Sequence, residues 1–385
     1  MPQNDLSRSY IPFKQDGTLV TVLEMSSKSW LLAGVVPGVK RQPRKGLPID
    51  PERLLAQLHR WRDEAVRAGH TIERMVVAFE AGRDGFWLAR WLQARGIEAY
   101  VVHASSIPVP REHRRAKTDR LDTEMLLRAL LGWLRGEPRH CHMVAIPTLA
   151  EEDAKRASRE RESLVDEKTR LTNRLTSILV ALGLPKIKIQ LRKTAKQLDA
   201  LRTPEGEPIP PHTLAELRRG LERLAVIKAQ IHAIEKARLE QLKAAPTQGT
   251  HPMMLMLAKV LGVGIETADR LVHEVLSRNL RDHRAVARYA GLTGSPDESG
   301  TQRREQGLAK AGNARVRRAM LQLAWRWLIH QKDSDLAKWY RARTADGRKD
   351  TRKIMIVALA RKLLIALWRY VNTGVVPGGV VLKQA

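Results

Sequence analysis

The sequence predicts an α/β domain with a mixed sheet, followed by a helical arm and a second, all-α domain. Up to about residue 150, short β-rich runs alternate with amphipathic helical patterns, which is typical of an α/β domain. Beyond that point the strand-like runs stop and only helical patterns follow. We therefore divide the chain into a polar tail at residues 1–16, an α/β domain at 17–150, an arm at 151–245 and a helical domain at 251–385.

The α/β domain is predicted from its alternating patterns. Its strands are rich in Val, Leu and Ile, and its helices carry apolar residues at spacings of three and four. A stretch rich in Pro, Gly and basic residues at 37–48 reads as a loop. The predicted strands are 18–24, 29–36, 74–80 and 97–103, and the predicted helices are 51–68, 84–95 and 117–134.

The arm is predicted to be an antiparallel coiled coil. Residues 151–182 form one highly charged helical pattern with an apolar stripe through Leu171 and Leu175, and a Gly-Leu-Pro break at 183–185 ends it. In residues 214–242 the apolar positions again step by three and four, close to a heptad seam. Two such helices joined by an irregular segment favour a helical hairpin.

Charge and composition exclude several classes of protein. The chain has 385 residues and a formal net charge of +27, and an ordered protein this basic most often binds a polyanion, nucleic acid first. Its single cysteine, Cys141, excludes a disulfide scaffold and a four-thiolate zinc site. There is no apolar signal core, and no apolar stretch approaches the roughly 18–20 residues of a membrane span. We expect a cytoplasmic protein with no membrane partner.

Four carboxylates are candidate metal ligands. Glu24 and Glu80 each close an apolar strand pattern, where a charge is unusual. Asp119 and Asp122 are three residues apart on a predicted helix, so they share a face. Four such carboxylates can hold two Mg²⁺ ions, the arrangement that cleaves phosphodiesters. The alternative is that the aspartates are ordinary solvated surface residues.

Two segments of the helical domain suggest contacts with DNA. Gly262 and Gly264 lie between helical patterns, as in a helix-hairpin-helix turn whose N–H groups face a phosphate; the alternative is an ordinary helix turn. Residues 289–300 form a loop with Ser299, a hydroxyl that beside cations can attack phosphorus, although Ser-Gly is commonly just a turn. The residues after it that we expect to contact DNA are Arg303, Arg304, Lys310, Asn313, Arg315, Arg317 and Arg318.

Together these motifs resemble the insertion sequence one-hundred-ten family of DEDD (RuvC-like) transposases. Residues 117–122 (KTDRLD), with Glu80 before them, are similar to the family's DEDD motif. Gly262-Val263-Gly264, Gly291-Leu292, Ser299-Gly300 and residues 312–318 are similar to motifs of its second domain. The likeness runs in order from about residue 17 onward. One departure is Glu24, which stands where the family usually has a shorter Asp.

The resemblance implies a fold, an activity and partners. It implies an RNase H-like first domain, a coiled-coil arm and a helical transposase domain with a helix-hairpin-helix-like element. By similarity, Glu24, Glu80, Asp119 and Asp122 coordinate Mg²⁺, and Ser299 forms a covalent phosphoserine link while DNA is cut and rejoined. The family also implies a non-coding bridge RNA that guides the enzyme to DNA, assembly as dimers and tetramers, and a bacterial cytoplasm, nucleoid-associated location.

A basic face on the first arm helix is the candidate RNA-binding surface, and a solvated charged helix is the alternative. Its residues are Lys155, Arg156, Arg159, Arg161, Lys168, Arg170 and Arg174.

Two other functions remain open from the sequence. A metal-dependent RuvC-like junction nuclease would need the carboxylates but not Ser299. A basic nucleic-acid-binding scaffold would need neither, and the presence of all four acids and the serine argues against it.

Overall fold

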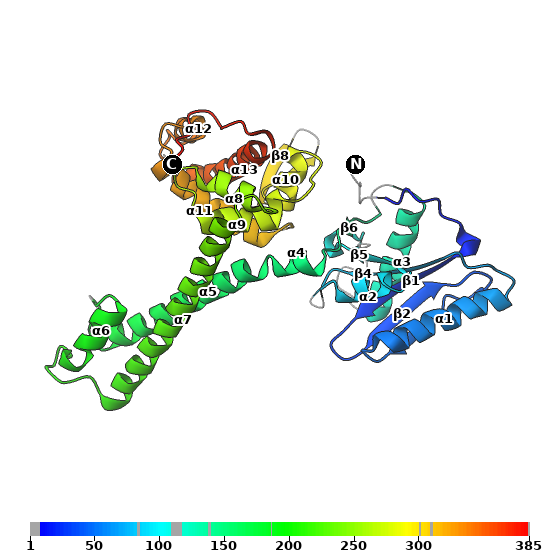
Figure 1. Ribbon diagram of the computed structural model, residues 1–385, viewed down its shortest axis with the longest axis horizontal. Helices are drawn as coiled ribbons and strands as arrows, with labels where there is room; N and C mark the ends of the chain where they lie inside the picture. Colours follow the sequence, from blue (N-terminus) through cyan, green and yellow to red (C-terminus); the bar gives the residue numbers. More distant parts are fainter. Residues whose placement is uncertain are drawn as a thin grey trace. The chain divides into compact units, whose positions relative to one another are not determined.

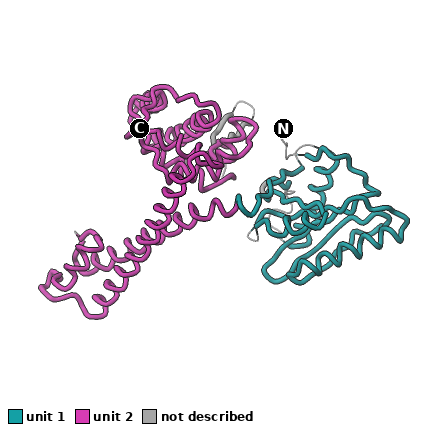
Figure 2. Tube along the Cα trace, viewed as in Figure 1, with its two compact units in different colours: residues 1–151 teal, residues 152–385 magenta. Residues whose placement is uncertain are grey.

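The computed structural model describes residues 8–82, 85–108, 118–137, 140–185, 187–299, 302–308 and 311–383, with the backbone alone for 105, 296–299 and 302–306. It forms two compact units, Met1–Glu151 and Glu152–Ala385, which Figure 2 colours separately. We describe each unit by itself.

The first unit is built on a six-stranded mixed sheet in the order β3-β2-β1-β4-β5-β6. The central strands β1, β4 and β5 are parallel, whereas β2, β3 and β6 join them by antiparallel pairing. This confirms the predicted α/β domain with a mixed sheet. The strands are β1 (Thr18–Met25), β2 (Trp30–Val35), β3 (Arg44–Leu47), β4 (Arg74–Glu80), β5 (Glu98–Val102) and β6 (Met143–Val144).

Helices cover both faces of this sheet (Figure 1). On one face, α1 (Pro51–Arg67) and α2 (Trp87–Gln93) pack on the odd-numbered residues of β1, β4 and β5, such as Leu23 and Phe79. On the other, α3 (Asp119–Leu134) packs on the even-numbered ones, such as Val22. Successive residues of a strand point to opposite faces, so each strand serves two cores. Short 3₁₀ turns occur at Gln15–Gly17 and Ala104–Ser106.

Three parts of the sequence prediction are wrong. Strand β3 lies inside the predicted loop at 37–48. The strand was missed because it is an edge strand with one buried residue, Leu47, and so shows no alternation of apolar and polar residues. The predicted loop at 289–300 contains a hairpin strand instead. The predicted single helix over 151–182 is two helices, α4 (Leu149–Asp153) and α5 (Arg156–Ala181).

The arm of the second unit pairs α5 with α7 (Pro211–Ala244), and α6 (Leu191–Gln197) and a 3₁₀ turn at Leu198–Ala200 come between them. The helices are antiparallel, since Arg161 reaches Glu235 while Arg174 reaches Glu216. The predicted helical hairpin is therefore present. Their shared core contains Leu175, Leu179, Leu217, Leu221 and Leu224.

Gly220 sets how closely the two arm helices approach. It is buried within α7, and a Cβ at this position would overlap the side chain of Leu175 on α5. Glycine costs a helix interior about 1 kcal/mol relative to alanine, so its presence here reflects close packing.

We expect Gly220→Ala to destabilise the arm by about 1–3 kcal/mol, because overpacking outweighs the gain in helix propensity. Urea unfolding followed by circular dichroism measures this. In a Leu175→Ala background, where the space is free, the same change should be neutral or stabilising. A rise in stability from Gly220→Ala alone would contradict the assignment.

The rest of the second unit is a helical bundle with a β-hairpin, as Figure 1 shows, which confirms the predicted helical region. Its core centres on Trp327, whose indole N–H donates to Ser334 Oγ at 2.9 Å. None of the described helices has both the length and the apolar character needed to cross a bilayer. The elements are α8 (His251–Ala258), α9 (Ile265–Leu271), a π turn (Val272–Leu276), α10 (His283–Tyr289), β7 (Gly294–Ser299), β8 (Gln302–Leu308), α11 (Ala314–His330), α12 (Asp335–Arg343) and α13 (Lys349–Thr373).

Candidate functional site

Glu24 and Glu80 are neighbours at one edge of the sheet. The parallel strands β1 and β4 pair Leu23 with Phe79, so the next residue of each strand is a glutamate at the same level. Because side chains alternate along a strand, both glutamates belong to the sheet face that α3 covers. Two carboxylates side by side repel each other, and a cation between them relieves that repulsion.

Asp119 and Asp122 occupy the first turn of α3, which Thr118 caps through its side chain. The helix crosses the sheet from β3, where Glu124 pairs with Arg44, to β5, where the Trp133 ring lies 4.9 Å from that of Tyr100. These contacts place the start of α3 toward the β3 side of the sheet and its end toward the β5 side.

The four predicted metal ligands thus form two pairs on one face of the sheet. Across the described residues, no three acidic, histidine or cysteine side chains lie close enough together to hold a metal ion. The oxygen donors suit a hard cation such as Mg²⁺. The two glutamates suit such an ion. For the aspartates to join them in one site, the start of α3 would have to move toward the ends of β1 and β4.

Ser299 ends strand β7 of the hairpin in the second unit, where its backbone pairs with Gln302. The register places Arg303 opposite Glu298 and Arg304 opposite Asp297. These placements concern the backbone only. Lys310, which we also expected to contact DNA, lies outside the described residues.

Asn313 begins helix α11 and also holds a buried acid. Its side-chain oxygen accepts hydrogen bonds from the N–H groups of Arg315 and Val316, and its Nδ2 donates to Glu274 Oε2 at 3.0 Å. Arg159 of α5 donates to the other oxygen, Oε1, at 2.9 Å. From the sequence we expected Asn313 on DNA and Arg159 on RNA, whereas both bind the carboxylate of Glu274.

Glu274 is only 3% exposed and is charged. Burial by itself raises the pKa of Glu274, but hydrogen bonds from Arg159 and Asn313 outweigh burial and hold the pKa below its usual value. Glu274 was missed by the sequence analysis, although a lone acid in the apolar run 271–276 is a signal that could have revealed it.

Glu162 of α5 forms ion pairs with three other arginines. Its carboxylate is 3.1 Å from Arg315, 3.3 Å from Arg318 and 3.8 Å from Arg270. A groove of about 440 Å³ lies beside it. The groove brings the start of α11 together with α5, and it is lined by Arg159, Glu162, Ser163, Asp166, Asn313, Ala314, Arg315 and Arg318.

Buried ion pairs tie the arm to α9. Arg238 of α7 is 6% exposed and pairs with Glu266 and with Asp269. Arg161 of α5 contacts the same Glu266 at 3.0 Å, as well as Glu235. Such contacts fix the orientation of these helices, and they occupy Arg161, which we had expected on an RNA surface.

The other five residues of the predicted RNA surface differ in exposure. Arg156 and Arg170 are exposed, Lys155 and Lys168 are partly exposed, and Arg174 pairs with Glu216. Ion pairs to Glu274, Glu266 and Glu216 thus occupy Arg159, Arg161 and Arg174, three of the seven residues of the predicted RNA surface. Arg317 of the predicted DNA set donates to carbonyls of Gly291 and Ala311.

The predicted glycine turn joins α8 to α9, as a helix-hairpin-helix turn does. Gly262 has φ of +89°, and a Cβ there would press against His330, which explains the glycine structurally. Gly264 caps α9, and no atom lies within 4 Å of where its Cβ would be. The C-terminal segment covers part of the turn, because Lys383 Nζ donates to the carbonyl of Val263 at 2.9 Å.

Comparison with known proteins places these features in a family. Residues 50–183 match the DEDD transposases of IS110 elements, described as "Transposase", and residues 254–341 match the family described as "Transposase IS116/IS110/IS902 family". The protein named "Putative transposase y4rJ" from Sinorhizobium fredii (strain NBRC 101917 / NGR234) is 43% identical over 378 residues, 95% of each chain. This chain belongs to the IS110 family of DEDD transposases. "Transposase for insertion sequence element IS1328" from Yersinia enterocolitica is 22% identical over 306 residues, 78% of this chain and 85% of that one.

Membership of the IS110 family confirms the resemblance seen in the sequence. An IS110 transposase cleaves and rejoins DNA, so the chain is a DNA-processing enzyme. Glu80, Asp119 and Asp122 lie inside the first matched region and Ser299 inside the second, whereas Glu24 precedes the first match.

Proposed function

We propose that this IS110 transposase recombines DNA through a covalent bond between Ser299 and a DNA phosphate. The observation that carries the proposal is the position of Ser299 at the end of β7, within the matched region 254–341. The sheet order of the first unit also supports the proposed RNase H-like (RuvC-like) fold, whose two glutamates meet at one edge.

In this mechanism Ser299 attacks the scissile phosphate. A new Oγ–P bond replaces one P–O bond of the strand, and the departing sugar oxygen takes up a proton. The phosphodiester energy is kept in the serine ester, so a sugar hydroxyl of the exchanged strand can reverse the step without ATP.

Glu24 and Glu80 would hold Mg²⁺, with Asp119 and Asp122 completing the set. A bound Mg²⁺ supplies charge stabilisation for the phosphate in the transition state. The carboxylates hold the cation. The DNA backbone would be held near the serine by Arg303, Arg304, Lys310, Asn313, Arg315, Arg317 and Arg318. Gly262 and Gly264 would present backbone N–H groups to a further phosphate.

A non-coding bridge RNA would choose the DNA sequence by base pairing, while protein contacts remain independent of sequence. An RNA surface on α5 is supported by the exposure of Arg156, Arg170 and Arg174 and the partial exposure of Lys155 and Lys168. The arm would be a coiled coil that helps the protein assemble as dimers and tetramers on the bacterial nucleoid.

The test is a denaturing gel of labelled donor DNA with Mg²⁺, the element's RNA and either wild-type protein or Ser299→Ala. We expect a protein-linked DNA band that disappears in Ser299→Ala and persists in the control Ser295→Ala, which changes the same strand of the hairpin. Free cleaved ends that persist in Ser299→Ala would overturn the serine mechanism in favour of a metal-dependent junction nuclease.

A further inference from the structure

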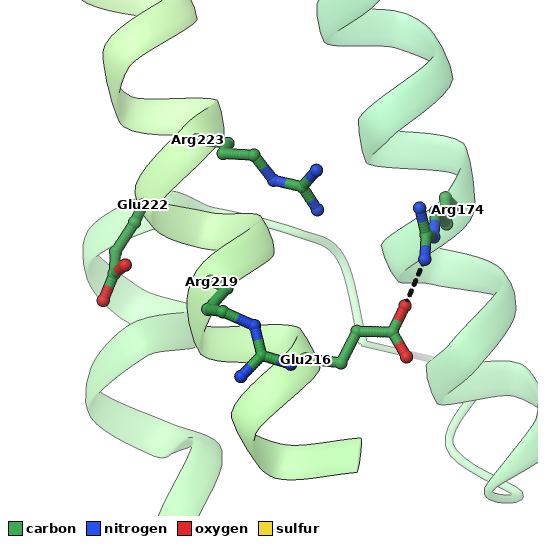
Figure 3. A pocket seen from close by; sticks show the side chains of 5 residues that line it. All are labelled: Arg174, Glu216, Arg219, Glu222 and Arg223. Atoms are coloured by element: carbon green, nitrogen blue, oxygen red, sulfur yellow. Dashed lines mark hydrogen bonds and ion pairs between the residues drawn. The ribbon is translucent and has the colours of Figure 1, made fainter. Parts of the chain in front are cut away.

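A second groove, of about 600 Å³, lies between the two arm helices. It is lined by Arg174 of α5 and by Glu216, Arg219, Glu222 and Arg223 of α7. Figure 3 shows Arg223 reaching into the space between the helices, with Arg174 opposite and Glu222 turned away. The lining side chains are all charged, unlike the mostly apolar lining of a small-molecule site.

Two of the three arginines in this groove are uncompensated. Arg174 is paired with Glu216, and Arg218, which precedes Arg219 on α7, is paired with Asp199. Within the described part of the chain, no carboxylate lies in ion-pair range of Arg219 or Arg223. Like charges four residues apart on a helix destabilise it, and these two are separated by about 6 Å along the axis, roughly one turn.

The groove adjoins the close approach of the two arm helices. Directly beside Arg174 and Arg219, Leu175 packs against Gly220 at the close approach of the two helices, and both residues are buried. The backbone positions of the arginines therefore adjoin a closely packed part of the arm.

We propose that this groove binds the phosphodiester backbone of a nucleic acid through Arg219 and Arg223, with Arg174 as a third contact. Guanidinium groups bind phosphate oxygens in a bidentate way, and two of them one turn apart can engage successive phosphates. This inference rests on the proposed function in one respect: it takes nucleic acid to be the ligand of the groove. It adds a contact on the arm that is separate from Ser299 and from the carboxylates.

The test measures binding of the full chain to short fluorescent duplexes of RNA and of DNA that lack element sequences, across a salt series. In Arg219→Gln/Arg223→Gln we expect the slope of log affinity against log salt to fall by about 2, with about tenfold weaker binding. The control Lys228→Gln/Lys243→Gln removes two exposed charges from α7 outside the groove. Loss on RNA alone, on DNA alone or on both supports the site and identifies its ligand. Equal behaviour of the two double variants overturns it.

A reciprocal variant protects the test against simple misfolding. Glu216→Gln frees Arg174, so we expect tighter binding and a steeper salt slope, and weaker binding would contradict the proposal. A chain that forms no adduct at Ser299 yet shows these effects would overturn the proposed function alone. An adduct-forming chain whose groove variants match the control would overturn this inference alone.

Discussion

Glu80→Gln is expected to lower the rate of DNA strand cleavage by about 1,000-fold. This change keeps the shape of the side chain but removes the charge beside Glu24 at the sheet edge. Metal ions supply several kcal/mol of transition-state stabilisation, and about 4 kcal/mol corresponds to this factor. Single-turnover cleavage of labelled donor DNA in Mg²⁺ measures the rate, and Glu24→Gln should show a comparable loss.

The matched control is Glu73→Gln at the opposite end of the same strand. Glu73 precedes β4, is exposed and pairs with Lys14, so its loss should leave cleavage within about twofold. DNA binding should survive in all three variants. If Glu80→Gln cleaved DNA at the wild-type rate, the carboxylates at this edge of the sheet would have no part in cleavage.

Arg159→Ala is expected to lower the free energy of unfolding by about 2 kcal/mol near pH 7. The variant leaves the buried carboxylate of Glu274 with Asn313 but without its charged partner. Removing one partner from a fully buried pair costs about 3–5 kcal/mol, and the partial exposure of Arg159 reduces this cost through solvent screening. Urea unfolding of the full chain measures the difference, and Arg156→Ala, an exposed neighbour on α5, should stay within about 0.5 kcal/mol of wild type.

The same pair predicts a pH dependence. Because the pKa of Glu274 is held below its usual value, the stability it contributes is present above that usual value and lost as the pH falls through the lowered pKa. In Arg159→Ala the hydrogen bond that lowers the pKa of Glu274 is gone, so burial raises that pKa. As the pH falls, Glu274 becomes protonated, and the cost of burying its unpaired charge decreases. The stability curves of the two proteins should converge in acid; a constant difference across pH would contradict the role of this carboxylate.

The parts of the fold that follow from apolar periodicity could be predicted from the sequence. Strands β1 and β4 and helices α1 and α3 each bury a regular set of side chains, and their patterns gave their positions to within two residues. The sequence also placed Glu24 and Glu80 near the C-terminal ends of two apolar strands, and these two strands are parallel neighbours.

The rest depends on contacts between distant segments. An arginine on a charged helix looks the same in sequence whether it faces solvent, as Arg156 does, or a buried carboxylate, as Arg159 does. The partner of Arg159 lies 115 residues away, at Glu274. Likewise, the direction in which α3 crosses the sheet decides where Asp119 lies, and helical spacing within α3 carries no information about that crossing.

The ion pairs between α5 and the helical bundle limit which insertions the chain can tolerate. Arg159, Arg161 and Glu162 lie within four consecutive residues and reach Glu274, Glu266 and Arg315. One added residue just after them, within α5, would rotate all three by about 100° relative to the part of α5 that packs on α7, and would break these pairs together. Changes in length should therefore accumulate at the opposite end of the arm, between α5 and α7, where irregular segments and short helices absorb them.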